Sequence, residues 1–157
     1  MKKPGIGDVF EIQDDDQNCF YYAAVGLGYD VCLFDIASTK TIKSVDELKD
    51  VPILARLAVA QRSIWSFKNK VVGKIVRDSI CNQYGRYVYR MTPDRVYTMS
   101  GKNGSLVEAT EDKVIGLEPT AVYDLEFHVI PSLQSHYFGI EHSAHLLADF
   151  ALNSKCE

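Results

Sequence analysis

Four histidines give this 157-residue chain its clearest chance of metal chemistry. All of them fall within the last thirty residues, and on a helix His142, His145 and Asp149 would share one face at positions i, i+3 and i+7. Zinc could use such a trio. The pattern is not His-Glu-x-x-His, however, and no second element supplies an obvious fourth ligand. We interpret these histidines as surface residues or as residues that cap the fold, and we predict no metal.

The four cysteines are the next candidates for chemistry, because a thiolate can act as a nucleophile. Cys19, Cys32, Cys81 and Cys156 contain no Cys-x-x-Cys pair, so the spacing predicts neither a zinc ribbon nor a disulfide framework. Cys19 or Cys32 could pair with a C-terminal histidine, but both lie in apolar segments where a buried thiol is inert. Neither Gly-x-Ser-x-Gly nor a phosphate-binding glycine loop is present. We predict no catalytic residues and no cofactor.

A run of three aspartates and a surplus of aromatic residues point to binding instead. Stacked carboxylates steer cationic partners, although the simplest interpretation of this run is a solvated hairpin tip. Its spacing does not fit an EF-hand loop. Tyr and Trp often anchor protein interfaces, although sheets also favour Tyr. The predicted partner-binding residues are Asp14, Asp15, Asp16, Tyr21, Trp65 and Phe67.

Composition limits the class of partner. The net charge is −4, with no cluster of Lys and Arg, which argues against binding to nucleic acid phosphates. No apolar run reaches the length of a membrane span, and the start does not resemble a signal peptide. With 46% hydrophobic residues the chain can bury a core unaided. We expect a single domain, 1–157, in the bacterial cytoplasm.

The first half of the sequence predicts strands around a short helix. Gly7–Ile12 and Cys19–Gly26 form a predicted antiparallel hairpin with the acidic run at its tip, and Tyr29–Ile36 follows as a third strand. Ser44 and Glu47 make a capping box for a short helix that ends before Pro52.

The central region, 52–76, holds two apolar runs joined by a loop that contains Trp65. In Ile53–Ala60, a two-residue period puts Ile53, Ala55, Leu57 and Val59 on one face and Arg56 on the other, although a helix is the rival. Val71–Val76 is rich in β-branched residues. We predict two core strands.

The second half predicts further strands and then helices. Tyr84–Met91 is followed by Arg95–Met99 and Ser105–Ala109, which flank a tight Asn-Gly turn with positive φ angles. A helical turn begins at Thr110, a helix runs from near His128 to Gly139, and an apolar stripe predicts a last helix after Ile140. The fold class is α+β: a strongly bent antiparallel β-sheet or partial barrel with one or two C-terminal helices.

Short motifs are spread over most of the chain. They are Gly7–Ile12, Phe34-Asp35-Ile36, Asp46-Glu47-Leu48 before Pro52, Leu57-Ala58-Val59, Val71-Val72-Gly73, Leu117–Tyr123 and His136-Tyr137-Phe138-Gly139. Together these motifs resemble the immunity protein 26 family of bacterial polymorphic toxin systems. One position departs from the family pattern, because Lys70 stands where a Trp is expected and the Trp of this chain is Trp65.

The resemblance implies a small β-rich immunity protein, not an enzyme, that binds and neutralises a cognate protein toxin encoded beside it. If that toxin is a nuclease, an acidic inhibitor could cover its basic cleft. Two alternatives remain open. An RNA-cleaving toxin of the MazF type also begins with a Gly-Asp-hydrophobic strand, but this chain lacks the Arg-Pro pair after the first hairpin and has the wrong net charge. A Cys/His hydrolase is the other.

Overall fold

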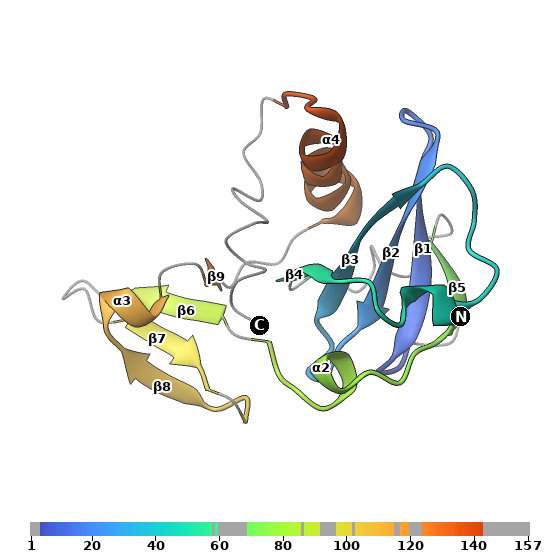
Figure 1. Ribbon diagram of the computed structural model, residues 1–157. Helices are drawn as coiled ribbons and strands as arrows, with labels where there is room; N and C mark the ends of the chain where they lie inside the picture. Colours follow the sequence, from blue (N-terminus) through green and yellow to red (C-terminus); the bar gives the residue numbers. More distant parts are fainter. Residues whose placement is uncertain are drawn as a thin grey trace.

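The computed structural model describes residues 4–57, 59, 69–85, 87–91, 97–101, 103–114, 117–119 and 124–142. These residues form two β-sheets and a small number of helices (Figure 1). None of the helices within these ranges is long and apolar enough to cross a membrane.

The larger sheet has five antiparallel strands in the order β4-β3-β2-β1-β5. Its strands are β1 (Asp8–Asp14), β2 (Cys19–Val25), β3 (Val31–Ser38), β4 (Ile53–Leu57) and β5 (Asn69–Lys74). The first four strands form a meander, and β5 pairs with the remaining side of β1. The sheet curls partly without closing into a barrel, which confirms the predicted α+β class with a bent antiparallel sheet (Figure 1).

The two central apolar runs occupy opposite edges of this sheet, and the prediction of two core strands is confirmed for β4, which is buried, and needs correction for β5. The strands β4 and β5 do form, but Val71 is 52% exposed and Val76, just beyond β5, is 91% exposed. The predicted shared face of β4 is also wrong at one position. The register shifts between Leu33 and Phe34, and Ile53 therefore packs in a different apolar cluster from Ala55, Leu57 and Val59.

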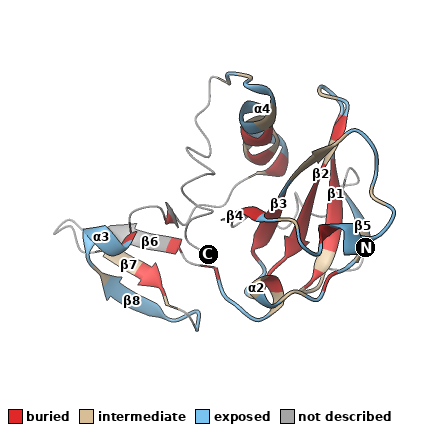
Figure 2. Ribbon diagram, viewed as in Figure 1, coloured by how far each residue is buried: buried red, intermediate tan, exposed pale blue. Residues whose placement is uncertain are grey.

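Both faces of the central strands are buried, because side chains alternate between two apolar clusters (Figure 2). In β1, Phe10 and Ile12 face one cluster and Val9 faces the other. The first cluster is covered by a π-helical turn, η2 (Leu125–Val129), and α4 (Ile130–Phe138). The second is covered by η1 (Val45–Leu48) and α2 (Asp78–Cys81).

Local capping signals fix the ends of these helices. The Ser44 and Glu47 capping box is present at η1, as predicted. Asp124 caps η2 by accepting hydrogen bonds from the backbone N–H groups of Glu126 (2.9 Å) and Phe127 (3.0 Å). Pro131 lies in the first turn of α4, and Gly139 ends that helix in the left-handed conformation, with φ of 67°, which confirms the predicted helix end.

The smaller sheet comprises β6 (Tyr87–Met91), β7 (Tyr97–Ser100), β8 (Leu106–Ala109) and β9 (Glu118–Pro119), in the order β8-β7-β6-β9. The pairing of β9 with β6 is parallel and was not predicted. After β8 comes α3 (Glu111–Val114), where a helical turn was predicted, and Val114 packs with Met99 and Leu117.

The turn between β7 and β8 differs from the predicted tight Asn-Gly turn. The Gly104 N–H donates to the Gly101 carbonyl (3.1 Å), and the Gly101 N–H donates to the Ser105 carbonyl (2.6 Å). The positive φ falls at Gly104, at 80°. This is a three-residue loop closed by one left-handed glycine. The last predicted helix lies largely outside the described residues, which end at 142.

Candidate functional site

The acidic run lies at the turn between β1 and β2, and its first carboxylate points inward. Asp14 is only 3% exposed. It accepts hydrogen bonds from the Tyr21 hydroxyl (2.7 Å), from Gln134 Nε2 in α4 (3.0 and 3.1 Å), and from two backbone N–H groups of the turn. The Asp14 carboxylate therefore ties the hairpin end to α4, and it is not available to a partner in this structure.

The other two aspartates are exposed on the turn itself. Asp15 Oδ1 accepts a hydrogen bond from Gln13 Nε2 (2.8 Å). The Asp14 carboxylate binds the N–H groups of Asp16 and Gln17 at 3.1 Å, and Asn18 completes the turn with φ of 52°. The turn is thus held from within while it presents two carboxylates to solvent.

The difference between the three aspartates had a signal in the sequence. Asp14 follows Phe10 and Ile12 at intervals of two residues, which places it on the buried face of β1. Extension of the predicted strand Gly7–Ile12 by two residues would have assigned Asp14 to the interior and left Asp15 and Asp16 outside.

Tyr21, another predicted contact residue, is 1% exposed. Its ring stacks on that of Tyr137 in α4, with centroids 6.0 Å apart and planes 17° from parallel. Burial raises the pKa of the Tyr21 hydroxyl, and its hydrogen bonds to Cys19 and Asp14 raise it further. The Tyr137 hydroxyl in turn donates to Asp35 Oδ1 (2.7 Å). Tyr21 therefore positions α4 on the sheet.

Trp65 and Phe67, the remaining predicted contact residues, lie outside the described residues. Among the described tyrosines, the more exposed ones are Tyr29 (48%) and Tyr84 (39%). The sequence did not single out Tyr29, which lies just before β3 in the left-handed conformation, with φ of 62°.

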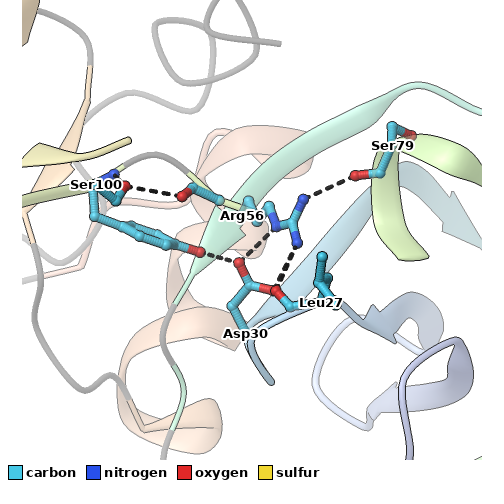
Figure 3. Close-up of polar contacts among 7 residues, drawn as sticks. Leu27, Asp30, Arg56, Ser79 and Ser100 are labelled. Atoms are coloured by element: carbon cyan, nitrogen blue, oxygen red, sulfur yellow. Dashed lines mark hydrogen bonds and ion pairs between the residues drawn. The ribbon is translucent and has the colours of Figure 1, made fainter. Parts of the chain in front are cut away.

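A buried ion pair joins the two sheets, and sequence reasoning missed it (Figure 3). Arg56 on β4 binds Asp30 through Nε to Oδ2 (2.6 Å) and Nη2 to Oδ1 (3.1 Å). The Tyr87 hydroxyl, from β6 of the smaller sheet, donates to the same Asp30 Oδ2. The side chains of Arg56 and Asp30 are 15% and 7% exposed. This two-point guanidinium–carboxylate geometry gives both strength and direction.

The rest of the Arg56 guanidinium is also occupied. Nη1 donates to the Ser79 carbonyl (2.8 Å) and Nη2 to the Leu27 carbonyl (3.3 Å). Two glycines make room for the group: a Cβ at Gly26 would lie 2.6 Å from Arg56 Nη2, and one at Gly85 would lie 2.5 Å from Asp30 Oδ2. The signal in the sequence was a lone arginine in an apolar strand, which requires a buried anion.

Ser100 extends this junction into the smaller sheet. Its hydroxyl donates to the Gly85 carbonyl (2.9 Å) and accepts from the Tyr87 N–H (2.7 Å). Burial raises the pKa of the Tyr87 hydroxyl, and the Asp30 carboxylate raises it further, so the tyrosine stays a donor. With their bonding groups engaged inside the protein, Asp30, Arg56 and Tyr87 connect the two sheets.

The described histidines and Cys19 do not form a metal site or a nucleophile within the described residues. His128 Nδ1 accepts from the Asp124 N–H (2.7 Å), and His136 Nε2 lies 3.9 Å from Asp35 Oδ1. Within the described ranges no group of three or more metal-binding side chains occurs, and the predicted trio partners His145 and Asp149 lie outside them. Burial raises the pKa of the Cys19 thiol, which disfavours the thiolate that a nucleophile requires.

The buried titratable groups of the larger sheet thus hold elements together, while the acidic turn presents charge outward. Comparisons of the chain with protein-family models, with curated proteins and with solved structures found no match.

Proposed function

We propose that this protein is an immunity protein, which binds a cognate bacterial toxin and neutralises it by occluding its active site or functional surface. The observation that carries the proposal is the acidic turn between β1 and β2, where Asp15 and Asp16 are exposed while Asp14 is held inside by Gln134 and Tyr21. The motifs that resemble immunity protein 26 support it: Gly7–Ile12 leads into β1, Phe34–Ile36 lies in β3, and Asp46–Leu48 lies in η1.

A turn of this kind suits a binding role for two physical reasons. Because the Asp14 carboxylate already orders the backbone of Asp16 and Gln17, little conformational entropy remains to be lost when a partner binds. Two adjacent carboxylates on a protein of net charge −4 also raise the rate of encounter with a basic surface. A toxin with a basic substrate cleft, such as a nuclease, fits this surface.

The first test is co-expression with the toxin that the proposal expects to be encoded by a neighbouring gene. Rescue of growth, together with recovery of a stable complex in a pull-down, is the expected result. Absence of both rescue and complex would overturn the proposal. Incubation of the protein with labelled RNA provides a separate check, because cleavage would favour an RNA-cleaving toxin of the MazF type.

The contact surface is tested by charge reversal that spares the buried aspartate. The double substitution Asp15→Lys and Asp16→Lys should slow association with the toxin by about tenfold at low salt and flatten the salt dependence of the rate. The matched control is Asp46→Lys with Asp50→Lys, two exposed aspartates in and after η1. Because Val45 of η1 lies against Gly73, opposite Val9 of β1, this pair is remote from the turn. Equal slowing by both pairs would remove the turn from the interface.

A further inference from the structure

The strand β8 is an exposed edge of the smaller sheet. Among the residues that the structure describes, it pairs on one side only, with β7. Leu106 is 59% exposed and Val107 is 39% exposed, and β8 is mostly exposed along its length (Figure 2). A row of unpaired backbone groups beside apolar side chains is a template for another strand.

This edge carries one charged side chain, that of Glu108, but it lacks the lysines and the register shift that the same protein has at another edge. At the β5 edge of the larger sheet, Lys70 and Lys74 are exposed, and the register shifts opposite Gly73. Lysines and bulges of this kind discourage strand addition. In contrast, β8 pairs with β7 in unbroken register and contains neither proline nor lysine. The β8 edge is therefore suited to accept a partner strand.

The hydrogen-bonding phase of β8 follows from the turn that precedes it. The Gly101 N–H bonds to the Ser105 carbonyl, so Gly101 and Ser105 are a hydrogen-bonded pair. Bonded and non-bonded pairs alternate in an antiparallel ladder. The register then makes Val107 bond to Met99, and it turns the N–H and C=O groups of Leu106 and Glu108 away from β7.

The position of this edge is fixed before any partner arrives. The Gly101–Gly104 turn packs on the Tyr84 ring, since a Cβ at Gly104 would lie 3.2 Å from the ring, as would one at Gly28 of the larger sheet. After β8, Val114 of α3 packs against Met99 of β7, so the contact holds the strand beside β8 and leaves the outer edge of β8 open. An edge held in this way loses little freedom on binding.

The side chains along the edge define the chemistry of the occupant. Leu106 and Glu108 alternate with Val107 and so lie on one face of the strand. Glu111 and Asp112 of α3, just after β8, are also exposed, and Lys113 is the single exposed cation there among the described residues. A complementary strand would place an apolar side chain beside Leu106 and a basic one beside Glu108.

We infer that the β8 edge binds, as an added strand, an extended segment of the toxin that carries an apolar and a basic side chain two residues apart. The inference rests on the proposed function for the identity of the partner. The β8 edge would be a second contact surface, separate from the acidic turn. It would recognise the partner by backbone hydrogen bonds as well as by charge.

Hydrogen exchange of the free protein and of its complex with the neighbouring gene product tests the inference. The amides of Leu106 and Glu108 should slow at least tenfold on complex formation. Glu108→Pro removes an outward N–H without removing a bond to β7, and an edge strand tolerates proline there. It should weaken the complex about tenfold, whereas Glu108→Ala, which keeps the N–H and removes the charge, should weaken it only a few-fold.

The outcomes separate the two proposals. A complex that forms without protection of these amides, and with unchanged affinity for Glu108→Pro, overturns the edge as a contact and leaves the immunity role intact. Absence of any complex overturns both. If the free protein is already a dimer in which these amides are protected, the occupant is a second copy and the inference fails. Leu106→Lys, which sets a cation against a basic strand, gives the same test if the proline variant does not fold.

Discussion

Removal of the Arg56 guanidinium should be among the most damaging single changes to this protein. Arg56→Ala would leave the Asp30 carboxylate, whose side chain is only 7% exposed, with the Tyr87 hydroxyl but without the cation that binds both of its oxygens. Breaking a buried pair in this way costs about 3–5 kcal/mol, because an uncompensated charge remains inside. Against a total stability of about 5–15 kcal/mol for a typical protein, that is a large fraction.

Urea unfolding followed by circular dichroism measures this cost. With a denaturant dependence of about 2 kcal/mol per molar urea, the midpoint should fall by roughly 1.5–2.5 M. Arg77→Ala is the matched control, because Arg77 Nη1 donates to a neutral acceptor, the Val51 carbonyl, at 2.5 Å. Loss of a hydrogen bond from a charged donor to a neutral acceptor costs about 1.5–3 kcal/mol, and it leaves no buried charge without a partner.

Two results would refute this account of the junction. One is a loss for Arg56→Ala that does not exceed the loss for Arg77→Ala. The other is additivity in a double-mutant cycle between Arg56→Ala and Asp30→Ala, since residues in direct contact should couple by about 0.5–3 kcal/mol.

Three further predictions concern packing, pH and the hairpin end. Gly26→Ala should lower the free energy of unfolding in urea by about 3 kcal/mol, because its Cβ would lie 2.6 Å from Arg56 Nη2 and disrupt the ion pair. The control is Gly139→Ala, whose Cβ would have nothing within 4 Å. It should cost only about 1–2 kcal/mol, which is the cost of placing an alanine in the left-handed conformation. Burial raises the pKa of Tyr22 to about 12, and its bond to the Glu11 carboxylate raises it too. The folded protein therefore keeps a proton that the unfolded chain loses above its ordinary pKa of 10.0, so stability present below pH 10 is lost as the pH rises toward 12. Tyr22→Phe should remove about 1.4 kcal/mol per pH unit from the slope of unfolding free energy in that window, and an unchanged slope would contradict the assignment. Asp14→Ala should cost about 3 kcal/mol in thermal unfolding, because it leaves the buried donors of Tyr21 and Gln134 without their acceptor. Asp15→Ala on the same turn should change the stability by no more than about 0.5 kcal/mol. Similar losses for both variants would refute the inward role of Asp14.

Local features of the fold could be predicted from the sequence because their signals are local. The capping box at Ser44, the glycine end of α4 at Gly139 and the first hairpin each depend on a few neighbouring residues. The positions of β4 and β5 at opposite edges could not be predicted in this way, because strand order depends on pairing between distant segments. The register shift that moves Ile53 to the other face has the same origin.

The candidate sites also depended on contacts between distant segments, which the sequence did not reveal. Charge alone made Asp14, Asp15 and Asp16 equivalent, and the structure separates them by the phase of β1 and by Gln134 of α4. The partners of Arg56 were hidden for a related reason, since Asp30 and Tyr87 come from a turn and from a second sheet. A sequence shows that a buried cation needs an anion, but it does not show which anion is near.

The polar contacts of this fold also imply an order of assembly during synthesis. Arg56 follows its partner Asp30 by 26 residues, Tyr87 follows Asp30 by 57, and Gln134 follows Asp14 by 120. At about 5–20 residues per second, Gln134 is made roughly 6–24 s after Asp14. Until then the Asp14 carboxylate lacks its α4 partner, and the apolar face of β1 lacks Leu133. The ribosome-bound chain can therefore complete the Arg56 junction well before it completes the acidic turn, so the surface proposed to meet the toxin matures last.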